Sequence, residues 1–96
     1  MAHTKPEDLR DVEQELEALR ALENVREKSK GVFYYKSLPF LHFHDKQGAR
    51  WADLKLRGGG WRKLEIGFGA SKAERARFLR EARAAHGELL AGAKKK

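Results

Sequence analysis

The spacing of apolar residues changes twice along this 96-residue chain, and those changes limit the folds that it can adopt. Up to Asn24, apolar side chains recur every three or four residues. From Gly31 they follow a period of two, and after Ser71 the helical spacing returns. Alternation is typical of strands, and a spacing of three to four is typical of amphipathic helices. The sequence therefore predicts a helix, a run of short strands and a second helix.

The two predicted helices have recognisable starts. Thr4 can cap the first helix with Glu7 completing a capping box, and Ser71 with Glu74 repeats this arrangement at the second. The first helix is expected to end near Asn24, and the second at Gly87 or Gly92. Their apolar faces comprise Leu9, Val12, Leu16, Leu19 and Leu22, and then Phe78, Leu79, Ala82 and Ala85. The first set does not sustain heptads, which favours packing on a sheet over a coiled coil.

Four strands are expected between the helices, at residues 32–35, 40–45, 51–56 and 61–68. Turns at Ser37-Leu38 and Gln47-Gly48, and a loop at residues 57–60, would pair them in antiparallel order. The predicted fold class is α+β, a single two-layer domain of order α-β-β-β-β-α. Its antiparallel four-stranded sheet carries two helices on one face. The domain is expected to span residues 1–93, with residues 94–96 as a disordered basic tail.

This register assigns each strand residue to a face, because alternate residues of a strand point in opposite directions. The face expected beneath the helices collects Val32, Tyr34, Leu41, Phe43, Ala52, Leu54, Leu64, Ile66 and Phe68. The opposite face collects Phe33, Tyr35, Phe40, His42, His44, Trp51, Asp53, Trp61 and Lys63. An uncovered patch of this kind is typical of a binding site.

Composition excludes several classes of protein. The chain has no cysteine, which removes disulfides and thiolate metal sites. No stretch approaches the roughly 20 apolar residues of a membrane helix, and the N-terminus lacks the apolar centre of a signal peptide. A cytoplasmic location, no membrane association and no cofactor are expected.

The charge is unevenly distributed. Residues 1–28 carry five basic and eight acidic side chains, whereas residues 29–96 carry sixteen basic and six acidic ones, within a net charge of +7. A basic region permits binding to a polyanion, and it equally permits attraction between the two parts of the fold. The cations expected to contact phosphates are Lys63, Lys72, Arg77 and Arg80.

The most suggestive local pattern is His42-Phe43-His44, because both imidazoles share one face of a strand. The register places His42 opposite Asp53 and His44 opposite Trp51. Two histidines and a carboxylate can bind a metal, which makes a metal-dependent enzyme at His42, His44 and Asp53 one alternative. Histidines packed among aromatic rings, with His42 bonded to Asp53, are the commoner arrangement. No catalytic motif is present, and neither glycine-rich segment has the form of a phosphate-binding loop.

The leading hypothesis is a binding domain for a ligand or a protein partner. The residues expected to contact the ligand are Phe33, Tyr35, Phe40, His42, His44, Trp51 and Asp53. A nucleic-acid-binding domain is the first alternative. The hypothesis leaves open whether the protein is an enzyme, and whether it is a monomer or a homodimer formed through the aromatic face.

The segment from Gly31 to His44, followed by Ala52-Asp53-Leu54, resembles a pattern found in small bacterial domains of unknown function. One such group is labelled "luciferase domain" and has a strand ending in His-x-His, a short hairpin and then Ala-Asp. The order of helix, compact sheet and closing helix is also similar to YjbR/MmcQ-type α/β domains. The resemblance covers residues 31–54 and implies a fold and a His/Asp cluster, with no established activity. This chain departs from the luciferase-labelled group in returning from Asp53 through a short hairpin, where that group has a longer insertion.

Overall fold

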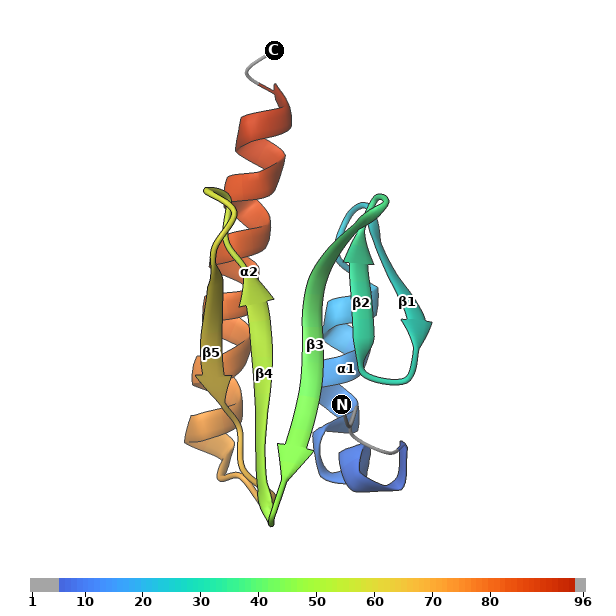
Figure 1. Cartoon of the computed structure of the whole chain (residues 1–96), viewed down its shortest axis with the longest axis vertical. Helices are drawn as coiled ribbons and strands as arrows, with labels where there is room; N and C mark the ends of the chain where they lie inside the picture. The colour runs from blue at the N-terminus through green and yellow to red at the C-terminus, as the bar shows by residue number, and fades with distance from the viewer. Residues whose placement is uncertain (1–5, 95–96) are drawn as a thin grey trace.

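The computed structural model describes residues 6–94, with side chains for residues 7–92. The chain forms one α+β domain in which a five-stranded antiparallel sheet packs against a layer of helices (Figure 1). The strands follow one another in the sheet in sequence order: β1 (Val25–Ser29), β2 (Val32–Tyr35), β3 (Leu38–Lys46), β4 (Ala49–Lys55) and β5 (Trp61–Glu65). The predicted fold class is confirmed in outline, but the predicted number of four strands is wrong.

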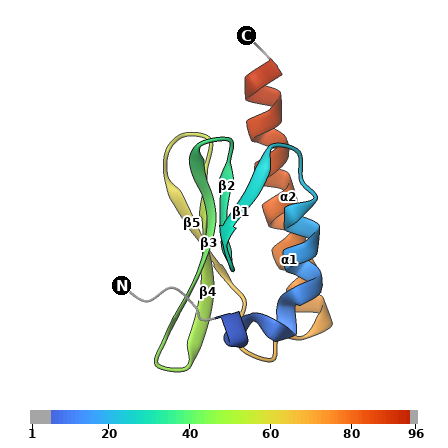
Figure 2. The same cartoon turned by 90° about the vertical axis from the view of Figure 1, so that its right-hand side faces the viewer.

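The helices lie together on one face of the sheet (Figure 2). A 3-10 helix (Pro6–Val12) leads into α1 (Glu13–Arg20), and α2 (Lys72–Lys94) closes the domain. Within residues 6–94, no helix combines the length and apolarity needed to cross a bilayer.

The predicted cap of the second helix is present, since Ser71 Oγ accepts a hydrogen bond from the Glu74 amide at 3.1 Å. The helix continues past Gly87 and Gly92, where the sequence indicated an end, and it includes Lys94 from the predicted tail. Thr4, the predicted cap of the first helix, and residues 95–96 of the tail lie outside the described residues.

Strand β1 is the element that the sequence analysis did not predict. Its sequence, VREKS, is rich in charge, which is typical of an edge strand protected from pairing with another chain. An ion-pair cluster attaches it to α1, because the Arg20 guanidinium contacts Glu27 on β1 and lies 3.0 Å from Glu13 on the helix. Lys30 Nζ also approaches Glu13, at 2.7 Å. Tertiary contacts with the helix therefore hold a segment whose own apolar pattern is weak.

The β2–β3 hairpin turns one residue earlier than predicted. Tyr35 pairs with Leu38, so the turn occupies residues 36–37, and an irregularity then places Phe33 opposite Leu41. The extra residue at this irregularity shifts the pairing by one, which exchanges the two faces of β2 relative to β3. Phe33 and Tyr35 consequently point toward the helices, in contrast to the prediction.

The β3–β4 hairpin has the predicted register. A two-residue turn at Gln47-Gly48, with φ of 51° and 81°, connects Lys46 to Ala49. Both turn residues are left-handed, as the tightest hairpin turns require. The confirmed pairs are Leu41–Leu54, His42–Asp53, Phe43–Ala52 and His44–Trp51.

The hydrophobic core lies between the sheet and the helices. Its buried residues are Leu9, Val12, Leu16, Leu19, Phe33, Tyr35, Phe40, Leu41, Phe43, Ala52, Leu54, Leu64, Ile66, Ala70, Phe78 and Ala82. Three residues predicted for this face lie elsewhere. Val32 pairs with His42 and, like Tyr34, points away from the helices. Phe68 follows the end of β5, is 42% exposed, and packs 4.8 Å from the Arg50 guanidinium.

Arg50 connects the sheet to the start of the helical layer. Its side chain is fully buried, and its guanidinium donates to the two Asp11 carboxylate oxygens at 2.7 and 2.8 Å. It also donates to the backbone carbonyl oxygens of Asp8, Ile66 and Gly67, at 2.7–2.8 Å. The hydrogen bonds from Arg50 hold the pKa of the Asp11 carboxyl below its ordinary value of 3.8. One side chain thus joins three segments that are distant in sequence.

Gly31, at the β1–β2 turn, is the glycine that the fold requires most strictly. Its φ is +81°, and a Cβ there would lie 2.7 Å from Leu9 Cδ1 in the core. We expect Gly31→Ala to lower the free energy of unfolding by about 2–4 kcal/mol, combining left-handed strain with overpacking. Gly48→Ala is the matched control, because Gly48 has the same φ with open space around it. Urea unfolding of both variants measures the difference, and equal losses would contradict the role of Leu9.

Candidate functional site

The face of the sheet opposite the helices carries the candidate site (Figure 2). The pairing of β2 through β5 brings aromatic and charged side chains together there. We call this surface the open face and define it by Lys28, Tyr34, His42, His44, Trp51, Asp53, Lys55, Trp61, Lys63 and Glu65. Alternation explains the set, because Leu41, Phe43, Ala52, Leu54 and Leu64, which lie between these residues in sequence, point into the core.

Five of these residues form a continuous cluster of rings. The His42 ring lies at its centre, with centroids 6.2 Å from Tyr34, 5.7 Å from Trp61 and 6.1 Å from His44. His44 in turn stacks on Trp51 at 5.8 Å. These separations are typical of interacting aromatic pairs. We call these five residues the ring cluster.

His44 is oriented by a carboxylate. Its Nε2 lies 3.2 Å from Asp53 Oδ2, on the neighbouring strand, and its side chain is almost completely buried. The carboxylate itself is about one-third exposed, so Asp53 keeps contact with solvent. The sequence predicted that His42 would bond to Asp53. The structure shows an ion pair between His44 and Asp53, diagonal to the register pair of His42 with Asp53.

Lysines lie over three of the rings. Lys28 Nζ is 4.6 Å from the centroid of Tyr34, Lys55 Nζ is 4.9 Å from Trp61, and Lys63 Nζ is 4.8 Å from Trp51. An ammonium group over an exposed ring contributes about 0.5–1 kcal/mol. Among the ten residues that define the open face, the two carboxylates of Asp53 and Glu65 stand beside these three cations. Its charge is therefore positive.

A shallow hollow of about 330 Å³ lies at the centre of the open face. It is lined by His42, His44, Asp53 and Trp61. Trp61 is 46% exposed, which makes it the most accessible large ring of the cluster. The hollow thus offers an exposed stacking surface next to hydrogen-bonding groups.

Three of the predicted ligand-binding residues do not lie on the open face. Phe33, Tyr35 and Phe40 are buried in the core, so the prediction that they line the exposed surface is wrong. Tyr35 and Phe40 pack edge-on against the buried His86 of α2, with centroids 5.9 and 6.2 Å away. The remaining members of the predicted set, His42, His44, Trp51 and Asp53, are brought together as expected.

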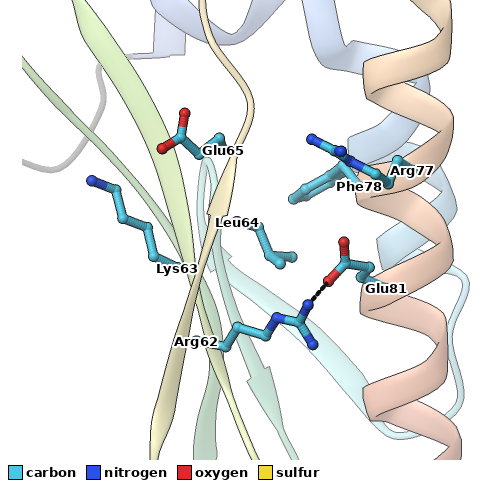
Figure 3. A pocket seen from close by; sticks show the side chains of 7 residues that line it. All are labelled: Arg62, Lys63, Leu64, Glu65, Arg77, Phe78 and Glu81. Atoms are coloured by element: carbon cyan, nitrogen blue, oxygen red, sulfur yellow. Dashed lines mark ion pairs between the residues drawn. The ribbon is translucent and has the colours of Figure 1, made fainter.

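The cations predicted to bind nucleic acid are divided between two layers. Lys63 belongs to the open face, whereas Lys72, Arg77 and Arg80 lie on α2. Figure 3 shows Lys63 pointing away from the helix that carries Arg77. A hollow of about 240 Å³ separates α2 from β5, bridged by an ion pair of 2.8 Å between Arg62 and Glu81.

Tyr34, Lys28 and Lys55 belong to the open face but were absent from the predicted site. Tyr34 was assigned to the core because the predicted hairpin lacked the irregularity that leaves Phe40 as an extra residue between Pro39 and Leu41. Lys28 lies on the unpredicted strand β1. Lys55 could have been found from the sequence, since it stands two residues after Asp53 on the same strand.

No grouping of three histidine, aspartate or glutamate side chains suited to a metal ion occurs among the residues that the structure describes. The arrangement of His42, His44 and Asp53 therefore adds no geometric support to the metal-dependent alternative. The rings of the open face can stack on flat groups, its histidines and Asp53 can form hydrogen bonds, and its lysines can attract negative charge.

Comparison with protein-family models, with curated proteins and with solved structures finds no match to this chain. The resemblance to the luciferase-labelled and YjbR/MmcQ-type domains stays a prediction. The functional argument consequently depends on the geometry of the open face.

Proposed function

We propose that the protein is a binding domain whose ligand lies on the open face, against the ring cluster. The observation that supports this proposal is the combination of five neighbouring rings with three lysine ammonium groups on the face that the helices leave uncovered. Rings recognise flat groups by stacking, and lysines recognise negative charge. The ligand is accordingly flat and anionic.

A titration with adenosine monophosphate, followed by two-dimensional amide NMR, tests this proposal. We expect shifts in the amide signals of β2 through β5, because the base can stack on Trp61 while the phosphate pairs with Lys55 or Lys63. Adenosine and inorganic phosphate should each produce smaller shifts than the two groups joined. Trp61→Ala should weaken binding by roughly tenfold, the effect of removing one stacking ring.

Leu38→Ala is the control, because Leu38 is 64% exposed and lies outside the ring cluster. It should leave the titration unchanged. Shifts confined to α2, or equal effects of the two variants, would contradict the proposal. So would a stable homodimer that buries the open face, which sedimentation at low and high protein concentration would reveal.

A further inference from the structure

We infer that the ligand of the open face is a single-stranded nucleic acid, an inference that rests on the proposed function. The rings form a row that crosses the sheet from β2 to β5, and the hollow beside them is shallow. From Tyr34 on β2, through His42 on β3, to Trp61 on β5, successive centroids are 6.2 and 5.7 Å apart. A small ligand would cover part of this row, whereas a chain with repeated flat groups can contact all of it.

The lysines stand beside the row at both of its ends. Lys28 lies over Tyr34 at one end, and Lys55 lies over Trp61 at the other. A single-stranded nucleic acid carries one phosphate for each base, so rings with cations beside them match its repeating chemistry. When a base stacks on a ring, the lysine above that ring can move to the adjacent phosphate.

The acidic part of the chain lies away from this surface. The carboxylates of α1, such as Glu13 and Glu17, belong to the helical layer behind the sheet (Figure 2). The core and the strands separate that layer from the open face, and charges beyond about 8–10 Å are screened at physiological salt. The acidic first helix therefore does not cancel the attraction of Lys28, Lys55 and Lys63 for phosphates.

A double helix fits the open face less well than a single strand. The flat surfaces of its bases are stacked on one another and cannot reach Trp61 or Tyr34. Single strands expose these surfaces to aromatic side chains, and stacking of this kind tolerates any base sequence. We therefore expect preference for single strands with little dependence on sequence.

Fluorescence anisotropy with labelled oligo-dT and oligo-U, at two salt concentrations, tests this inference. We expect binding at low salt, with a slope of about −2 for the logarithm of affinity against the logarithm of salt, from three lysine–phosphate contacts. Binding of either oligomer supports the inference. Whichever of the two binds more tightly shows whether the protein prefers DNA or RNA. Binding of a duplex or of heparin as tight as that of the oligomers would overturn it.

Two lysines provide a matched pair of variants. Lys63→Ala, on the open face, should make the slope of the logarithm of affinity against the logarithm of salt less negative by about 0.7. Lys72→Ala makes the same change of charge on α2 and should leave the slope unchanged. Trp61→Ala should weaken oligomer binding by roughly tenfold, and Leu38→Ala should have no effect. Equal effects of Lys63→Ala and Lys72→Ala would overturn the inference, since binding would then depend on net charge alone.

The two proposals can fail separately. If adenosine monophosphate shifts the signals of the open face while neither oligomer binds, the nucleic-acid inference is wrong and the binding face stands. If neither probe has any effect, both proposals are wrong.

Discussion

Replacing Arg50 with methionine is expected to lower the free energy of unfolding by about 3–5 kcal/mol, because a fully buried guanidinium loses its ion pair with Asp11 and leaves three backbone carbonyls without their donor. The substitution keeps an unbranched apolar side chain but removes five hydrogen bonds. Three of these bonds satisfy backbone carbonyls near the ends of β5 and the 3-10 helix, and a buried acceptor left without a partner costs about 1–3 kcal/mol. Urea unfolding followed by circular dichroism measures the loss.

Arg62→Met is the matched control for this prediction. The Arg62 side chain is 59% exposed and makes an ion pair with Glu81, so its removal should cost less than about 1 kcal/mol. The loss of stability in Arg50→Lys should lie between the losses in these two variants. Lysine keeps the positive charge, but it lacks the planar guanidinium that reaches several acceptors at once. If Arg50→Met is no more damaging than Arg62→Met, Arg50 does not hold the two layers together.

The ion pair between Arg50 and Asp11 should also make the stability of the protein depend on pH. Because Arg50 lowers the pKa of Asp11 in the folded protein, folding favours the ionised carboxylate. The resulting stability is complete well above pH 3.8 and is lost as the pH falls from there through the lower, folded pKa. The effect is modest, since the Asp11 side chain is 34% exposed. Arg50→Met should lack this contribution of Asp11, so its free energy of unfolding should change less with pH in this range.

Phe43→Ala is expected to lower the free energy of unfolding by about 3–5 kcal/mol, as large truncations in a core do. Phe43 is 1% exposed at the centre of β3, and its ring lies 5.5 Å from that of Phe78 on α2. Removing it leaves a cavity between the sheet and the helix that neighbouring side chains cannot fill. Thermal and urea unfolding both report this loss.

Leu38→Ala is the comparison for Phe43→Ala, because it truncates a large apolar side chain of the same strand that is exposed to solvent. It should cost less than about 1 kcal/mol, as surface substitutions usually do. Equal losses for the two variants would contradict the placement of Phe43 in the core.

The part of the candidate site on β3 and β4 follows from local sequence. The turn residues Gln47-Gly48 accept the left-handed conformations of a tight hairpin, and that turn determines which residues of β3 and β4 face each other. Simple alternation then brings His42, His44, Trp51 and Asp53 to one face. Because both the turn and the alternation are local properties, the sequence alone was sufficient for this part of the site.

The position of Tyr34 on the open face depends on the hairpin between β2 and β3. The sequence predicted a turn at Ser37-Leu38, yet the chain turns at residues 36–37 and then bulges near Phe40. Both arrangements are compatible with local preference. The difference lies in burial, since the observed register places Phe33 and Tyr35 against the helices and leaves Tyr34 on the open face. A choice that depends on packing against α1 and α2 cannot be made from a hairpin considered by itself.

By itself, then, the sequence determined the succession of helix, antiparallel hairpins and helix, the cap at Ser71 and the register of β3 with β4. These features depend on periodicity and on turn chemistry, which act over a few residues. Tertiary structure alone decided the existence of β1 and the face of each β2 residue. Those outcomes depend on contacts between distant segments, such as Arg20 with Glu27 and Arg50 with Asp11, whose energies no local pattern contains.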